Sequence, residues 1–393
     1  MQSAALAWLV YAVTGSPLFL GTLALFQLGP LILLVLPAGV FIDHWPKRKV
    51  LIATQTVFLL QAAALSALAF SGHATYQIIL PLSAIYGVTQ AFDSPGRRAF
   101  LMDLVGKDDL TNAVSLSSTV FSVARVVGPS LAALVIAKVG AGWCFMLNAA
   151  TYLAPIIALL KISVDGCPVP AQPAQKRVGS QVVEGLRYIW RTDTLRVTMA
   201  GAMAILIFGM NENVLAPVFA DRVLHMGVTG YGTLLSAWGF GALVGALVST
   251  ATSHRPGING RLFVVNGLAI GVIHLLVAWT AAFRASAALW TSTTLLIALG
   301  CASILFTNAA SSTVQSTADQ ALRGRVMSAY VLVDMGTMPV GNAFAGAVMS
   351  RWGAEAGFLA GGVMSLVVLG AVLLVGPQTE SLNGTSTAGQ RRS

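Results

Sequence analysis

The chain has 393 residues, of which 56% are hydrophobic and only 9% are charged, and its formal net charge is +9. Because soluble globular domains carry about 25% charged residues, this composition excludes an ordinary soluble protein and indicates one that lies in a membrane. The basic residues stand singly or in groups of two or three at the ends of apolar segments, which is typical of orientation in a bilayer and argues against nucleic-acid binding. The three cysteines show no CxxC spacing, so we expect neither a disulfide framework nor a metal site.

Long apolar stretches bounded by charge, Gly or Pro predict membrane-spanning helices along the whole chain. Residues 3–13 come first, and eleven residues at about 1.5 Å each are too short to cross about 30 Å of hydrocarbon. The stretches that are long enough lie at 17–42, 50–70, 76–92, 113–137, 142–160, 198–220, 229–251, 262–282, 287–308, 326–350 and 355–376. We therefore predict an all-α membrane protein with eleven full spans and one partial span.

The stretch "GVFIDHWPKRK", residues 39–49, places an acid and three bases between the first two full spans. If its loop is cytoplasmic, the alternation of the spans puts 18 of the 23 lysines and arginines on the cytoplasmic side. The positive-inside rule is then obeyed. We expect a multi-pass protein of the plasma membrane, the bacterial inner membrane, with its central linker and its C-terminus in the cytoplasm.

The longest polar stretch divides the chain into two hydrophobic halves. It begins with a Pro-rich linker and continues with "SQVVEGLRYIWRTDTLR", whose apolar residues recur at helical spacing and predict an amphipathic helix on the inner membrane surface. The predicted parts are an N-terminal transmembrane half at 1–161, the cytoplasmic linker at 162–197, a C-terminal transmembrane half at 198–376 and a cytoplasmic tail at 377–393.

An internal repeat supports this division. A shift of 213 residues superposes Gly128 on Gly341 and Phe145 on Phe358 without a gap, so the halves are parallel repeats of the kind found in many transporters. A second alignment, shifted by 211 residues, places the start of the seventh span about thirteen residues before Met1. We therefore expect the first helix to be truncated.

The stretch at 39–49 resembles the loop 2–3 signature of the major facilitator superfamily. The matching positions are Gly39, Asp43, Lys47, Arg48 and Lys49. His44 stands where Arg is usual, and Pro46 where Gly is usual. The stretches "AFDSPGRRAFLMDLV", "LTNAVSLSSTVFSVARVVGPSLAALV", "GAGWCFMLNAATYL" and "LRGRVMSAYVLVDMGTMPVGNAFAGAVMS" resemble the branch that contains the enterobactin exporter and macrolide efflux proteins.

This resemblance implies the major facilitator fold, in which two six-helix halves are related by a pseudo-two-fold axis and the protein works as a monomer without a cofactor. It also implies that the loop acts as an inner gate. In the family the acid latches against the start of span eleven, and a base pairs with an acid at the end of span four. These roles fall on Asp43, Arg48 and Asp93, with Gly39, His44 and Lys47 completing the gating motif. Membrane orientation alone is the simpler explanation of the bases.

Three charged residues lie within predicted spans, namely Arg125, Glu212 and Asp334. Each costs about 2.5 to 3.5 kcal/mol to insert at the bilayer centre, so a compensating role is expected. Burial of a carboxyl favours its neutral form, which makes Glu212 a candidate proton carrier. Structural pairing is the alternative for all three residues.

Three asparagines in the spans, Asn148, Asn211 and Asn213, could hydrogen-bond a substrate or serve the structure. Gly128 and Pro129 partly match the antiporter signature of span five, which favours export. Gly87 stands where many drug–proton antiporters carry a base, which argues against it. The small residues Gly241, Gly245, Gly341 and Gly346 are expected to be helix-packing positions.

We infer a secondary active transporter that exports a small amphiphilic organic molecule by proton antiport with alternating access. An uptake symporter of the same fold, or a truncated membrane protein that does not transport, are the alternatives. An enzyme is not expected, because the sequence has no HExxH, GxSxG or Walker loop. The expected partners are the small-molecule substrate, protons and the lipid bilayer.

Overall fold

The computed structural model describes the chain except for residues 107–108, 165–177, 253–257, 283–284, 321 and 376–393. The side chains of some helical residues, including Asp43, Arg125 and Pro129, also lie outside the described set. The same holds for the predicted tail and for most of the Pro-rich linker. Every regular element in the described part is an α-helix, which confirms the all-α prediction.

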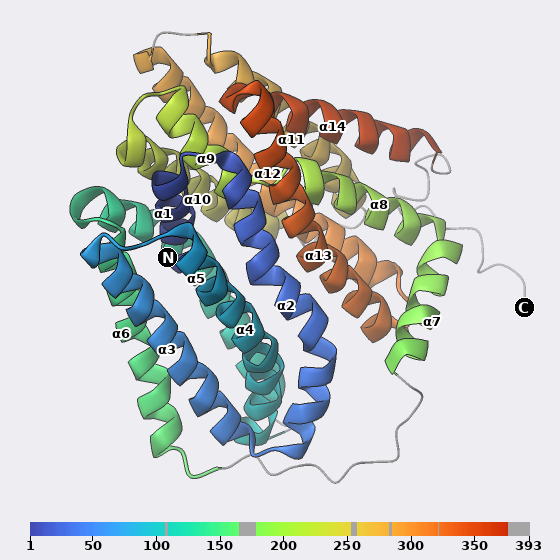
Figure 1. Ribbon diagram of the computed structural model, residues 1–393. Helices are drawn as coiled ribbons and strands as arrows, with labels where there is room; N and C mark the ends of the chain where they lie inside the picture. Colours follow the sequence, from blue (N-terminus) through green and yellow to red (C-terminus); the bar gives the residue numbers. More distant parts are fainter. Residues whose placement is uncertain (107–108, 165–177, 253–257, 283–284, 321, 376–393) are drawn as a thin grey trace, which may run out of the picture.

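Six helices precede the linker (Figure 1), and they are α1 (Gln2–Thr14), α2 (Pro17–His44), α3 (Lys47–Ser71), α4 (Tyr76–Val105), α5 (Leu110–Val139) and α6 (Ala141–Lys161). The linker helix is α7 (Val178–Arg191), and the second half holds α8 (Asp193–Phe208), α9 (Glu212–Arg222), α10 (Gly227–Thr252), α11 (Ile258–Thr280), α12 (Ala285–Thr317), α13 (Arg323–Trp352) and α14 (Ala354–Val375). By length and composition, nine helical segments of the described chain could cross a membrane.

Two helices extend further into polar sequence than the apolar pattern indicates. The three bases 47–49 form the first turn of α3 rather than part of a loop, because the helix begins directly after Pro46. Helix α4 continues through Pro95 and ends at Val105, and it is followed by Gly106, whose φ of 72° is accessible to glycine at little cost. Asp93 therefore lies inside a helix and not at its end.

The span predicted at 198–220 lies within a segment that could cross a membrane, Asp193–Arg222, but its helix is broken after Phe208. Gly209 ends α8, and Asn211 precedes the first residue of α9, Glu212. The Asn211 side chain donates to the carbonyl of Ile207 at 2.7 Å, and the Asn211 carbonyl accepts the first backbone bonds of α9. Asparagine competes with helical hydrogen bonding in this way, and glycine is a poor helix former.

The helices form two groups that share an interface. Helix α2 packs on α13, α5 packs on α10, and α1 packs on α9. Figure 1 shows the groups meeting around α1 and α9 and separating toward the end where α7 lies. We call this end the linker end, and we call the opposite end, which carries the turn between α1 and α2, the distal end.

Within each group, glycines allow backbones to touch. A Cβ atom at Gly241 or Gly245 of α10 would collide with the carbonyls of Ile297 and Cys301 in α12. A Cβ at Gly87 of α4 would collide with the backbone of Gln27 in α2. Gly87, which stands where many drug–proton antiporters carry a base, therefore lies where α2 and α4 meet too closely for any side chain.

Candidate functional site

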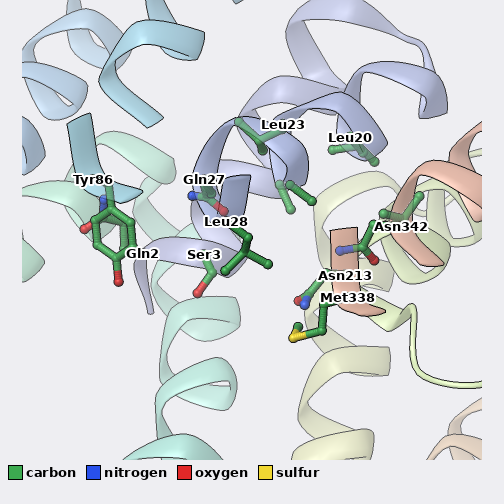
Figure 2. Close-up of a pocket in the computed structure, with 13 residues that line it drawn as sticks. Gln2, Ser3, Leu20, Leu23, Gln27, Leu28, Tyr86, Asn213, Met338 and Asn342 are labelled. Carbon is green, nitrogen blue, oxygen red and sulfur yellow. The ribbon is translucent and has the colours of Figure 1, made fainter. Parts of the chain in front are cut away.

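A cavity of about 240 Å³ lies between the two helix groups. Its walls come from α1, α2 and α4 on one side and from α9 and α13 on the other. The polar lining residues are Gln2, Ser3, Gln27, Tyr86, Asn213 and Asn342. Among the described residues, no charged side chain lines it. Figure 2 shows Asn213, Met338 and Asn342 facing Gln2 and Tyr86 across the cavity, with Gln27 and Ser3 between them.

One wall of the cavity is fixed by a chain of amide groups. The Gln2 side chain donates to Oε1 of Gln61 at 2.8 Å and accepts from Nδ2 of Asn148 at 2.6 Å. Gln61 in turn donates to the carbonyl of Leu82 at 3.3 Å. Asn148 therefore lies behind Gln2 and positions it, while Gln2 itself reaches the cavity.

The distal end of the interface is closed by contacts between the groups, which we call the distal closure. Tyr11 donates to Asp221 at 3.0 Å, Arg222 donates to the carbonyl of Gly15 at 2.7 Å, and Tyr231 donates to the carbonyl of Ala4 at 3.2 Å. The ring of Trp8 stacks on Tyr231 with centroids 5.6 Å apart. Aromatic and polar contacts thus join α1 to α9 and α10.

Close contact between α2 and α13 completes this closure. A Cβ at Gly346 would lie 2.6 Å from the carbonyl oxygen of Pro17, and one at Gly21 would lie 2.7 Å from Cα of Ala343. Toward the middle of α13, a Cβ at Gly341 would collide with the carbonyl of Ile207, beside the break that precedes α9. Glycine is required at these positions because the neighbouring atoms belong to backbone.

At the linker end, Asp93 is engaged within its own half. It is 4% exposed, accepts from Thr54 at 2.9 Å and from Gln55 at 2.6 Å, and pairs with Arg97 at 3.0 Å. Arg48 donates to the carbonyls of Leu159 at 2.7 Å and Leu160 at 3.0 Å, at the end of α6. The pairing of Arg48 with Asp93 stays a prediction.

The remaining residues of the gating motif lie at the turn between α2 and α3. His44 is exposed at the end of α2, and Gly39 has open space where a side chain would project. Lys47 is buried, and its Nζ atom lies 2.6 Å from Oδ2 of Asp103 at the end of α4. The backbone of Asp43 belongs to α2, and its side chain lies outside the described set.

The Lys47–Asp103 pair predicts a stability effect. Replacing Lys47 by methionine keeps the length of the side chain but leaves a carboxylate that is only 29% exposed without its cation. A hydrogen bond to a charged group contributes about 1.5 to 3 kcal/mol, so we expect the thermal unfolding midpoint of the purified protein to fall. The exposed neighbour Lys49 provides the control as Lys49→Met. Equal midpoints for the two variants would contradict the prediction.

The intramembrane charges flank the cavity rather than line it. Glu212 is 9% exposed at the start of α9, directly before the lining residue Asn213. Asp334 is partly buried in α13, four residues before the lining residue Met338. The side chains of Arg125 and Pro129 lie outside the described set, and a Cβ at Gly128 would lie 3.5 Å from the backbone nitrogen of Met1.

The sequence analysis missed several residues of this site. Gln27 and Asn342 line the cavity, and Gln61 supports its wall. All three are polar residues within long apolar stretches, where an amide is costly unless it finds a partner. The cost of burying an unpartnered amide is the sequence signal that marks these three residues. It does not distinguish residues that line the cavity from residues that support its wall.

A helical membrane chain whose two helix groups enclose a polar cavity, closed at one end, defines the class of membrane transporters rather than enzymes. The model of a major facilitator family described as "transmembrane secretion effector" matches residues 1–389. The chain therefore belongs to this family of the major facilitator superfamily.

Relatives of known name resemble most of the chain. The multidrug efflux pump Tap of Mycolicibacterium fortuitum is 28% identical over 392 residues, which cover 96% of this chain and 92% of that protein. The enterobactin exporter EntS of Shigella boydii is 28% identical over 291 residues, which cover 69% of this chain and 62% of that protein.

Solved structures agree on the fold. A bacterial homologue of the iron transporter ferroportin, in an inward-facing state, superposes with a TM-score of 0.69 at 15% identity, covering 94% of this chain and 95% of that one. The nucleoside transporter NupG also has a TM-score of 0.69, at 13% identity, covering 95% of this chain and 98% of that one. At these identities the likeness establishes the fold alone.

Proposed function

We propose that this protein exports a small amphiphilic organic molecule in exchange for protons, with the cavity between the two halves as the substrate site. The cavity carries this proposal, because it draws its walls from both halves and is sealed at the distal end by contacts that join them. The printed names of the relatives, a multidrug efflux pump and an enterobactin exporter, support the direction of transport.

In this proposal the linker end faces the cytoplasm, as the distribution of lysine and arginine predicts. The structure then corresponds to an inward-facing state, in which the distal closure separates the cavity from the outside. Alternating access requires a second state in which the distal closure opens and the linker end closes. The halves 1–161 and 198–376 would move relative to each other, joined by the linker 162–197, with the tail 377–393 also in the cytoplasm.

The charged residues take separate roles in this cycle. Asp43, Arg48 and Asp93 would form the gate when the linker ends of the two halves approach. Glu212 would carry the proton, because it is buried beside the cavity without being part of its lining. Asp334 and Arg125 would supply further charge within the membrane. Contacts that form in one state and break in the other bias the equilibrium between them.

A test of this function uses purified protein in liposomes and a panel of labelled amphiphiles that includes neutral, cationic and anionic members. Counterflow of any member distinguishes a transporter from a membrane protein that does not transport. Under an imposed pH gradient, antiport accumulates the solute on the acidic side and symport accumulates it on the alkaline side. We expect accumulation on the acidic side. Accumulation on the alkaline side would identify an uptake symporter, and the absence of counterflow for the whole panel would contradict transport.

A further inference from the structure

Three carboxamide groups in the cavity have no hydrogen-bond partner within the described part of the protein. They belong to Gln27 in α2, Asn213 in α9 and Asn342 in α13. They differ from Gln2, whose amide is already bonded to Gln61 and Asn148. Asn342 is only 6% exposed, so the cavity is the main space open to its side chain. Gln27 is half-buried and Asn213 is exposed, and both line the same cavity as Asn342. A buried amide without a partner, such as that of Asn342, is rare, and the three amides come from both halves of the molecule.

The described residues that line the cavity around these amides carry no charge. The rest of the described lining consists of Ser3, the ring of Tyr86, Gln2 and apolar side chains such as Leu20 and Leu23. The hydroxyl of Tyr86 also lacks a hydrogen-bond partner among the described residues. Glu212 and Asp334 lie near the cavity but do not line it. A charged solute would leave its hydration shell without meeting an opposite charge among the described lining residues, which is unfavourable in a low-dielectric site.

The chemistry of the carboxamide indicates what would bind. Each group offers two N–H donors and one carbonyl acceptor on the same plane, which matches another amide or a pair of hydroxyl and carbonyl groups. A solute with several such groups can bond to Gln27 on one side and to Asn213 and Asn342 on the other (Figure 2). An apolar part of the solute would face Leu20 and Leu23.

We propose that the cavity is selective for uncharged solutes rich in amide, hydroxyl or carbonyl groups, held at once by Gln27 of one half and by Asn213 and Asn342 of the other. This inference rests on the proposed function, in which the cavity is the substrate site. It narrows the substrate from amphiphiles in general to neutral ones, and it makes the three carboxamides the determinants of that choice.

Three compounds with one skeleton test the selectivity by equilibrium dialysis against the protein in nanodiscs. At about pH 7, N-acetyltryptophanamide is neutral, N-acetyltryptophan is an anion, and tryptophanamide is mostly a cation. We expect the neutral compound to bind at least about tenfold more tightly than either charged one. Empty nanodiscs correct for partition into lipid.

Charge-swap variants assign the effect to these residues. Gln27→Glu and Asn342→Asp keep the size of the side chain and introduce a carboxylate, so we expect each to shift the preference by about tenfold toward tryptophanamide. Asn308→Asp is the matched control, because Asn308 is exposed on α12 and does not line the cavity. Two variants are used so that one poorly folded protein does not decide the result.

Either of two results would overturn the inference, namely equal or tighter binding of a charged compound to the unaltered protein, or an unchanged preference in both variants. A protein that binds none of the three compounds would overturn it as well. These outcomes are separable from the proposed function. Counterflow of charged amphiphiles alone would leave transport intact and reject neutral selectivity, whereas selective binding without counterflow would reject transport and keep the site.

Discussion

Replacing Glu212 by glutamine is expected to abolish accumulation driven by a pH gradient while leaving counterflow of the same solute measurable. Glutamine preserves the size of the side chain but cannot release or take up a proton. Glu212 is 9% exposed and begins α9 beside the cavity residue Asn213, which is the position that the proposed proton carrier requires. The measurement compares counterflow and gradient-driven uptake in the same liposomes.

The control for this experiment is Glu355→Gln. Glu355 lies in the first turn of α14, is exposed and does not line the cavity. We expect this variant to retain both activities at the level of the unaltered protein. Gradient-driven accumulation that survives Glu212→Gln would remove Glu212 from the coupling mechanism, and loss of counterflow as well would indicate a role in binding or folding instead.

Replacing Gly346 by alanine is expected to open the distal closure. The new methyl group would lie 2.6 Å from the carbonyl oxygen of Pro17, a backbone atom that cannot move aside alone. Overpacking typically costs about 1 to 3 kcal/mol, and each 1.4 kcal/mol changes an equilibrium constant about tenfold. The variant should therefore favour the state in which the cavity is open to the distal side.

Labelling of a cysteine in the cavity can measure this shift. With the native cysteines replaced, Asn213→Cys is exposed to a membrane-impermeant maleimide on intact cells, and we expect labelling about tenfold faster with Gly346→Ala. Gly336→Ala is the matched control in the same helix, since a Cβ there meets nothing within 4 Å. Equal labelling rates in the two backgrounds would show that close contact at Gly346 does not hold the distal end closed.

Hydrophobic runs were enough to predict most of the helices. The helix at 142–160 was placed within one residue of α6, and the one at 355–376 within one residue of α14. The ends that differed are those where polar sequence continues a helix, as at Lys47 and beyond Asp93. Hydropathy reports where lipid begins, whereas a helix ends only where its backbone bonding is interrupted.

The break after Phe208 could not be predicted in the same way. Gly209 and Asn211 weaken a helix locally, but similar residues at Gly341 and Asn342 leave α13 continuous. The break lies at a contact between elements distant in sequence, since Gly341 of α13 lies against Ile207 and Asn211. The pattern of apolar and polar residues along the sequence contains no information on that contact.

The candidate site was predictable in part. Asparagines within apolar spans predict polar sites, and Asn213 does line the cavity while Asn148 supports it. Gln27 was not singled out, because one amide in a long apolar run is as consistent with a helix contact as with a cavity. Only the arrangement of both halves distinguishes the amides that are already bonded from those that are not.

The break in the seventh predicted span makes α9 a short helix that is separate from α8. It has 11 residues and is about 16 Å long, with Glu212 at one end and Arg222 at the other. Asn213 faces the cavity near the first end, and Asp221 and Arg222 hold the distal closure at the second. In the proposed cycle, a tilt of α9 that begins at Glu212 would therefore also move the residues of the distal closure. The proposed proton carrier, a residue of the proposed substrate site and two residues of the distal closure thus belong to one short helix.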